Sequence, residues 1–338
     1  MLRIGDIDIS NPFFLAPMSG VSDSPFRLLA MKMGAGAVVS EMIASEQLAI
    51  ENEEAVMKLK GEGISPNIVQ LAGREAKWME IGAKRARDSG ADIIDINMGC
   101  PAKKVTKGYS GSALMRDLDH ALKLIEATVN AVDCPVTLKM RLGWDDTSLN
   151  AAELAKRAED AGVQMIALHG RTRCQFYKGC ANWPAIGAVK DAISIPLIAN
   201  GDVVSVDDAA DILKITGADG VMIGRGTYGR PWLVGHAAHY FETGEVLDEP
   251  EGEALATIIT DHYQALLAHY GDYIGMRAAR KHLSWYLDAN PARASQTSND
   301  ERLLLLTSAD IDKVLKAINS IFSRPVAARL SDLEKDAA

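Results

Sequence analysis

The sequence of 338 residues lacks several features that would place it at once in a broad class of proteins. It has only four cysteines, without paired spacing, which predicts free thiols in a reducing compartment rather than a disulfide framework. No apolar run approaches the roughly 18–20 residues that a membrane-spanning helix needs. The first six residues turn acidic before the core of a signal peptide could form. We therefore expect a soluble protein of cytoplasmic type that has no membrane partner.

Positive charge is also in deficit. The chain has 36 Lys and Arg residues against 45 Asp and Glu residues, which gives a formal net charge of −9. Proteins that bind polyanions over a large surface usually have the opposite balance, so the net charge by itself argues against a nucleic-acid partner. The hydrophobic fraction of 48% and the charged fraction of 24% are ordinary for a globular protein and exclude wholesale disorder.

Eight short apolar segments with strand character recur through the first two thirds of the chain, at residues 12–18, 35–42, 67–73, 92–99, 135–143, 165–171, 196–203 and 220–226. Several are apolar almost without interruption, as strands of a parallel sheet covered on both faces are. The gaps between them mostly have helical periodicity, for example at residues 75–89, 112–132 and 151–161. Eight such units predict an α/β fold, and a closed (β/α)₈ TIM barrel rather than an open sheet.

The strand pattern ends at an acidic stretch. Residues 241–255 contain six acidic residues and no basic residue, and they read as a solvated connector. Beyond them only helical periodicity remains, and TSAD at residues 307–310 fits the start of the last helix. We predict a barrel domain at residues 1–243, a connector at 244–255, a small all-helical domain at 256–330 and a frayed tail at 331–338.

Polar residues follow every predicted strand. In a TIM barrel these ends converge on one mouth, where the chemistry takes place, and one mouth lined with polar groups is the default site. The series includes amides, a lysine and a histidine. The last strand leads into GRGTYG at residues 224–229, whose glycines and Arg225 favour phosphate binding. This segment matches GxGxxG, but no strand follows it, so it does not indicate a Rossmann fold.

Two residues of this series suggest specific chemistry. Cys100 lies just beyond a strand, on a loop flanked by glycine and proline, which favours acid–base or nucleophilic work over simple packing. Lys139 lies within an apolar strand, where it could form a Schiff base, place a cation against a cofactor, or pair with Glu41 or Asp95. The remaining cysteines have no metal-type spacing, and we expect no metal site.

Four segments together resemble one family: APMSGVSD at residues 16–23, DINMGCPAKKV at 95–105, HGRTR at 169–173 and NGD at 200–202. They resemble the tRNA-dihydrouridine synthases, with the bacterial DusB branch nearest. The similarity runs from about residue 11 to residue 230, and a helical tail typical of the family follows. The NMGCP segment is highly specific, whereas the wider flavin pattern is shared with dihydroorotate dehydrogenases.

The resemblance implies an FMN enzyme that reduces the C5–C6 double bond of uridines in the D-loop of tRNA, with NADPH resupplying the electrons. It implies that Cys100 donates a proton to C5 after hydride has reached C6, and that Asn97 and Arg171 contact the uridine. It implies that FMN is held by a set of residues from all around the mouth: Ala16, Pro17, Met18, Gln70, Lys139, His169, Asn200, Gly201, Asp202, Gly224 and Arg225.

The distribution of charge qualifies the acidic total. Residues 97–116 contain Lys103, Lys104, Lys107 and Arg116 and no acid, and residues 277–293 contain several cations against one acid. Two acid-poor basic segments indicate local RNA contacts, which we expect at Lys103, Lys104, Arg277, Arg280 and Lys281. Trp285, Tyr286 and Arg293 lie in the second segment, where the two aromatic residues either stack on bases or belong to the helical core.

Three alternatives remain open on the residues alone. One is a flavin barrel that acts on a free pyrimidine, as dihydroorotate dehydrogenases do. Another is a flavin-free barrel enzyme that uses Lys139 as a Schiff-base amine. A third is an RNA-binding regulator without catalysis. A monomer is the expected oligomeric state.

Overall fold

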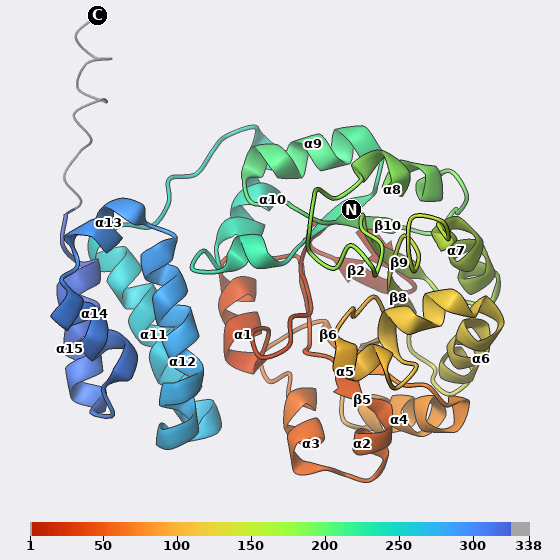
Figure 1. The fold of residues 1–338 in the computed structure, drawn as a ribbon, viewed down its shortest axis with the longest axis horizontal. Helices are drawn as coiled ribbons and strands as arrows, with labels where there is room; N and C mark the ends of the chain where they lie inside the picture. Colours follow the sequence, from red (N-terminus) through yellow and green to blue (C-terminus); the bar gives the residue numbers. More distant parts are fainter. Residues whose placement is uncertain (1, 326–338) are drawn as a thin grey trace, which may run out of the picture. The chain divides into compact units, whose positions relative to one another are not determined.

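The structure is a computed structural model that describes residues 2–325. Its main sheet closes on itself, because eight parallel strands each pair with the next and β3 pairs with both β4 and β11 (Figure 1). The predicted (β/α)₈ barrel is therefore confirmed. A short strand, β5 (Ile43–Ala44), pairs with β6 outside the ring. The eight barrel strands are β3 (Phe13–Leu15), β4 (Ala37–Val39), β6 (Asn67–Ala72), β7 (Ile93–Met98), β8 (Val136–Arg141), β9 (Met165–His169), β10 (Leu197–Asn200) and β11 (Gly220–Ile223).

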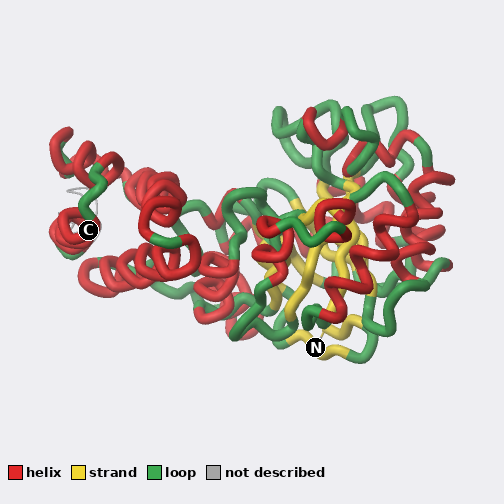
Figure 2. Tube along the Cα trace, turned by 90° about the horizontal axis from the view of Figure 1, so that it is seen from below, coloured by secondary structure: helices red, strands yellow, loops and turns green. Residues whose placement is uncertain are grey.

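Helices pack against the outside of the strands, and Figure 2 shows the strands in yellow among the red helices. Every residue of β6, β7 and β8 is buried, as strands covered on both faces should be. The helices of this unit are α1 (Ser24–Lys32), α2 (Ser45–Ala49), α3 (Glu53–Leu59), α4 (Ala76–Asp88), α5 (Lys103–Thr106), α6 (Leu118–Val129), α7 (Ala151–Asp160), α8 (Trp183–Lys190), α9 (Val206–Thr216) and α10 (Leu233–Thr243), with 3₁₀ turns η1 (Gly111–Arg116) and η2 (Arg225–Thr227).

A β-hairpin supplies apolar side chains to the core at the amino-terminal ends of the strands. It consists of β1 (Leu2–Ile4) and β2 (Ile7–Ile9), which pair antiparallel. Ile4 and Ile9 are fully buried and belong to the same apolar cluster as Phe14 of β3 and Ile93 of β7. Burying a side chain of this size stabilises the fold by about 1.5–3 kcal/mol. The hairpin therefore seals this end of the barrel with hydrocarbon.

The second compact unit is helical and comprises residues 228–230 and the chain from residue 247 onward. It contains α11 (Gly252–Tyr270), α12 (Asp272–Asp288), α13 (Pro291–Gln296), α14 (Asn299–Thr307) and α15 (Ile311–Phe322). In its core the Tyr286 hydroxyl lies 3.1 Å from His262 Nδ1. The Trp285 ring stacks on the Tyr228 ring, with centroids 3.9 Å apart. None of the helices in residues 2–325 is apolar over a length that would cross a membrane.

Three boundaries differ from the sequence prediction. The helix expected at 112–132 is split, because Asp117 interrupts it and caps α6 by accepting from the His120 amide at 3.0 Å. A capping box at 307–310 would make Thr307 the N-cap of the last helix. In the structure the N-cap is Asp310, so α15 begins three residues later. The first helix of the tail begins at Gly252 instead of residue 256. The predicted frayed tail, 331–338, lies outside the described residues.

Candidate active site

The carboxyl ends of the barrel strands, here called the mouth, bring together the polar residues that follow each strand. The parallel register places Asn97 beside Lys139, and His169 beside both Arg141 and Asn200. These five side chains are all buried. Buried polar groups require partners, so their contacts with one another decide what the site can do.

Two amides and a carboxylate form a chain of hydrogen bonds that leads to Cys100. Asn97 Nδ2 donates to Gln70 Oε1 at 2.7 Å, and Gln70 Nε2 donates to Asp95 Oδ2 at 2.7 Å. Asn97 Oδ1 accepts from the Cys100 amide at 2.9 Å. Burial raises the pKa of Asp95, although the bonds from Gln70 and Thr137 oppose this. The chain therefore fixes the backbone of Cys100 against β7.

Lys139 is a buried cation at the centre of the mouth. Its Nζ donates to Asn200 Oδ1 at 3.0 Å, and it makes no ion pair with Glu41 or Asp95 in the described chain. Burial, together with the charge of Arg141, lowers the pKa of Lys139 from 10.5 to about 8. At neutral pH the side chain therefore remains mostly cationic, but it is close to losing its proton.

His169 is held neutral in the same cluster. Burial, with the positive charges of Arg141, Lys139 and Arg171 as further causes, holds the pKa of His169 well below its usual range. A neutral imidazole has one donor and one acceptor nitrogen. His169 therefore offers hydrogen bonds without adding charge to the cluster.

Arg171 and Asp202 form a two-point ion pair at the rim. The guanidinium nitrogens donate to Asp202 Oδ1 at 2.7 Å and to Oδ2 at 2.6 Å, and Arg171 also donates to the carbonyls of residues 178 and 179. Each of its three nitrogens is thus engaged within the protein. Asp202 in turn lies 3.5 Å from Arg225. Direct contact of Arg171 with a substrate stays a prediction, and what the geometry shows is that Arg171 positions Asp202.

Two glycines leave room at the mouth. Gly201 has a φ of +128°, and a Cβ there would lie 2.8 Å from Ala181 Cβ, so no larger residue fits. Gly224 faces Ala16 and Met18, which a Cβ would meet at 3.5 and 3.6 Å. Arg225 follows it with a side chain 48% exposed. This combination of open backbone and a partly exposed cation, which lies 3.5 Å from Asp202, suits an anionic group such as a phosphate.

The Cys100 loop carries the first of the predicted basic groups. Cys100 is half-buried, and its carbonyl accepts from both the amide and the hydroxyl of Ser112, at 3.1 and 2.8 Å. Lys103 and Lys104 lie on α5 within this loop, and both are exposed. The thiol is therefore anchored through its backbone beside a basic surface.

The helical unit separates the predicted basic residues into two kinds. Arg277 is exposed on α12, and Arg280 and Lys281 on the same helix are partly exposed. Arg293, in contrast, is buried and donates to the carbonyls of residues 321 and 324. Tyr286 is buried in the core. Arg293 and Tyr286 therefore serve the packing of this unit, which decides against a role for Tyr286 in base stacking.

The sequence places Arg141 with Lys139 at the end of a predicted strand, but neither Arg141 nor Tyr177 was assigned a role in the site. Arg141 donates to the carbonyls of residues 99, 172 and 176 at 2.8–2.9 Å, and thereby joins the Cys100 loop to the loop after β9. The guanidinium carbons of Arg141 and Arg225 lie 5.4 and 4.7 Å from the centroid of the Tyr177 ring. Lys139 and Arg141 are two residues apart and therefore lie on one face of β8. This spacing is the sequence signal that places Arg141 in the site beside Lys139.

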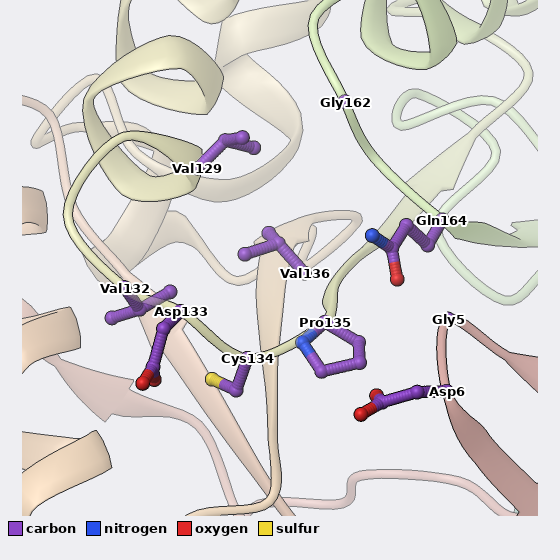
Figure 3. A pocket seen from close by; sticks show the side chains of 10 residues that line it. All are labelled: Gly5, Asp6, Val129, Val132, Asp133, Cys134, Pro135, Val136, Gly162 and Gln164. Atoms are coloured by element: carbon purple, nitrogen blue, oxygen red, sulfur yellow. The ribbon is translucent and has the colours of Figure 1, made fainter.

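A separate hollow of ≈360 Å³ lies at the amino-terminal ends of β8 and β9. Figure 3 shows Asp6, Cys134 and Gln164 around it. Burial raises the pKa of the Cys134 thiol, which makes Cys134 less reactive. Within residues 2–325, no three His, Cys, Asp or Glu side chains gather as metal ligands would.

Two solved structures have a similar fold at low sequence identity. The histamine dehydrogenase of Rhizobium sp. 4-9 matches with a TM-score of 0.56 at 16% identity, over 78% of this chain and 50% of that one. Morphinone reductase matches with a TM-score of 0.53 at 14% identity, over 75% of this chain and 91% of that one. These matches show the fold.

Sequence relatives are far closer. A protein of Rhizobium leguminosarum bv. phaseoli named "Probable tRNA-dihydrouridine synthase" is 54% identical over 324 residues, covering 96% of this chain and 95% of that protein. The "tRNA-dihydrouridine synthase B" of Pseudomonas putida is 47% identical and covers 86% of each chain. The family model for dihydrouridine synthase (Dus) matches residues 14–319. The predicted resemblance is thus confirmed, and the chain belongs to the dihydrouridine synthase family.

Proposed function

We propose that this protein reduces the C5–C6 double bond of specific uridines in tRNA to give dihydrouridine. The observation that carries the proposal is the match of residues 14–319 to the dihydrouridine synthase model. Relatives named tRNA-dihydrouridine synthase, at 47–54% identity, support tRNA as the substrate. Family membership favours this function over the dihydroorotate dehydrogenase, Schiff-base and non-catalytic alternatives.

The donor set of the mouth fits FMN. Gln70 and Lys139 offer an amide and a cation suited to the flavin ring, and Gly201, Gly224 and Arg225 offer open backbone and a cation suited to the phosphate. The full proposed set is Ala16, Pro17, Met18, Gln70, Lys139, His169, Asn200, Gly201, Asp202, Gly224 and Arg225. When bound and reduced, FMN supplies the hydride that C6 of the uracil receives.

Cys100 is the proposed proton donor. As C6 gains a hydride, negative charge develops at C5 and O4, and the proton of Cys100 Sγ moves to C5. Lys139 and Arg141 lie within electrostatic reach of this thiol. A proton from solvent then restores the thiol. Asn97, fixed by Gln70, is proposed to hold the edge of the uracil.

The uridine must leave its stacked position in the RNA to reach the mouth. We propose that Lys103 and Lys104 beside Cys100, and Arg277, Arg280 and Lys281 on α12, contact phosphates of the tRNA. NADPH as electron donor, a monomeric state and a cytoplasmic location complete the proposal.

The test uses the purified protein with FMN, NADPH and a tRNA transcript that contains no modified bases. Mass spectrometry of the digested RNA should show dihydrouridine, and tRNA should reoxidise the reduced flavin much faster than free uridine or orotate does. Turnover with only the free pyrimidine would support the dihydroorotate dehydrogenase alternative. A colourless protein that binds no FMN would overturn the proposal in favour of a Schiff-base enzyme.

A further inference from the structure

Two arginines flank one tryptophan at the mouth, outside the residues discussed so far. The guanidinium carbon of Arg116 lies 4.9 Å from the centroid of the Trp144 ring, and that of Arg173 lies 4.8 Å from it. Arg116 ends η1, Trp144 follows β8, and Arg173 follows β9. Each cation–π contact holds a guanidinium group against the Trp144 ring. The N–H groups of a guanidinium held in this way can still donate to an acceptor.

The backbone builds this arrangement. The Arg173 amide donates to the carbonyl of residue 143 at 3.0 Å, and the Cys174 amide donates to the Trp144 carbonyl at 2.9 Å. The segments after β8 and β9 thus stay paired beyond the barrel. Arg173 Nη2 also donates to Thr106 Oγ1 at 3.3 Å, on the loop that carries Lys103 and Lys104. The two arginines and the tryptophan therefore continue the basic surface beside Cys100.

Within the described part of the chain, no carboxylate pairs with either of the two arginines. In residues 2–325, neither Arg116 nor Arg173 forms an ion pair, although Arg3, Arg74, Arg85, Arg87 and Arg157 on the surface of the barrel do. Asp117, which follows Arg116, caps α6, and Asp145, which follows Trp144, accepts from Thr147 and Ser148. Two like charges held on one ring without a counter-charge favour the binding of an anion.

We propose that Arg116, Trp144 and Arg173 bind a backbone phosphate of the substrate RNA, next to the uridine that enters the mouth. This inference rests on the proposed function. A phosphate of NADPH would offer the same chemistry. The contact between Arg173 and Thr106 makes this site continuous with the exposed lysines of α5. An RNA strand carries a negative charge at each nucleotide and binds along such an extended basic surface, so RNA is favoured over the dinucleotide.

The test compares tRNA binding by the FMN-loaded wild type with that of Arg116→Ala, Arg173→Ala and Trp144→Leu. At 50 mM salt each arginine variant should bind about tenfold more weakly, and the slope of log Kd against log salt should fall by about one. Trp144→Leu keeps both charges, so its slope should not change while affinity falls about two- to fivefold. Arg116 is exposed, so its variant carries the test if Arg173→Ala fails to fold.

Lys123→Ala is the matched control, because Lys123 is an exposed cation on the neighbouring helix α6 that makes no ion pair in the described chain. An equal loss of slope in this control would show a general effect of net charge and would overturn the inference. A raised KM for NADPH in the arginine variants, with unchanged tRNA binding, would also overturn it in favour of the dinucleotide.

The outcomes separate this inference from the proposed function. The inference alone is overturned if the wild type makes dihydrouridine but the arginine variants keep the wild-type slope of log Kd against log salt. Slopes that fall as expected, without dihydrouridine from the wild type, overturn the proposed function alone. A wild type that does not bind tRNA overturns both.

Discussion

The two ends of the barrel differ in almost every physical respect. At the carboxyl ends of the strands, Lys139, Arg141, His169 and Arg171 are buried together with few acids. At the amino-terminal ends, Ile4 and Ile9 of the hairpin fill the interior. The cations of this group repel one another and lose hydration on burial, so the mouth is destabilised by its own composition. The apolar end contributes the burial that offsets this.

The difference teaches that stability and chemistry are divided along the axis of one barrel. A change at the mouth should therefore affect ligand binding or reaction, and a change at the hairpin should affect unfolding. The two cysteines at opposite ends, Cys100 and Cys134, allow the sharpest comparison.

Replacing Cys100 by Ala should give the largest effect. We expect reduction of the bound flavin by NADPH to continue at the wild-type rate, and transfer to uridine in tRNA to slow by about 10²–10⁴, because the proton donor is lost. Cys134→Ala, the matched control, should leave both steps unchanged. Stopped-flow flavin absorbance measures both half-reactions. Equal slowing of the two steps by Cys100→Ala would contradict the assigned role.

Replacing Ile9 by Ala should destabilise the fold without changing the chemistry. The loss of a fully buried side chain in the hairpin should lower the free energy of unfolding by about 2–5 kcal/mol. Denaturant unfolding measures this change, and rate constants of the folded fraction should remain those of the wild type. Leu149→Ala, at a side chain that is mostly exposed, should have little effect. A slower reaction in the folded Ile9→Ala variant would contradict the proposal that the hairpin end supplies stability and the mouth supplies the chemistry.

Replacing Asp202 by Asn tests the two-point ion pair between Arg171 and Asp202. Arg171 would keep its charge in a buried place without a carboxylate, which should lower the free energy of unfolding by about 2–4 kcal/mol. Burial opposes ionisation of Asp202, but the bonds from Arg171 and the Ala181 amide hold its pKa below the usual value. This stabilisation is therefore present above pH 4 and lost as the pH falls further.

Asp8→Asn is the control for this variant, because Asp8 forms an exposed pair with Arg3 at the hairpin. It should change stability little, since exposed pairs contribute little. Thermal unfolding between pH 3 and 7 measures both variants. If Asp202→Asn lost as much stability as the wild type on acidification, the ion pair would not be the source of the pH dependence.

The smallest expected effect concerns the charge of Lys139. Its pKa is lowered from 10.5 to about 8, so it loses its proton as the pH rises through 8. FMN affinity should then fall by about tenfold and should be low and independent of pH in Lys139→Gln. Flavin fluorescence titrations from pH 6.5 to 9.5 measure this, with Lys123→Gln as control. A pH profile that is the same in Lys139→Gln and the wild type would exclude Lys139 as the group responsible.

Much of this molecule was predictable from its sequence. The eight strands could be located because each is a short apolar run, and the residues after them could be assigned to one mouth because parallel strands end on the same side. Cys100 and Lys139 could be singled out by their positions on a loop and in a strand. The residue roles themselves remain predictions, because they depend on cofactor and RNA.

Other features could not be predicted because they join distant parts of the chain. Nothing local indicates that Arg171 pairs with Asp202, that residues 2–9 seal the barrel, or that Arg293 is buried. The grouping of Arg116 and Arg173 on the Trp144 ring depends on the pairing of two loops after separate strands. The composition and net charge of the chain do not depend on these contacts, so they could not reveal them.

The sequence by itself determined the barrel, the helical tail and the family, because periodic apolar patterns and short motifs are local properties of the chain. Only the tertiary structure decided which cations have counter-charges and which do not. The physical reason is that barrel closure brings side chains from separate strands within a few ångströms, where burial and charge together set their pKa and their partners. The acidic total of −9 is thus compatible with an uncompensated cluster of positive charge at the mouth.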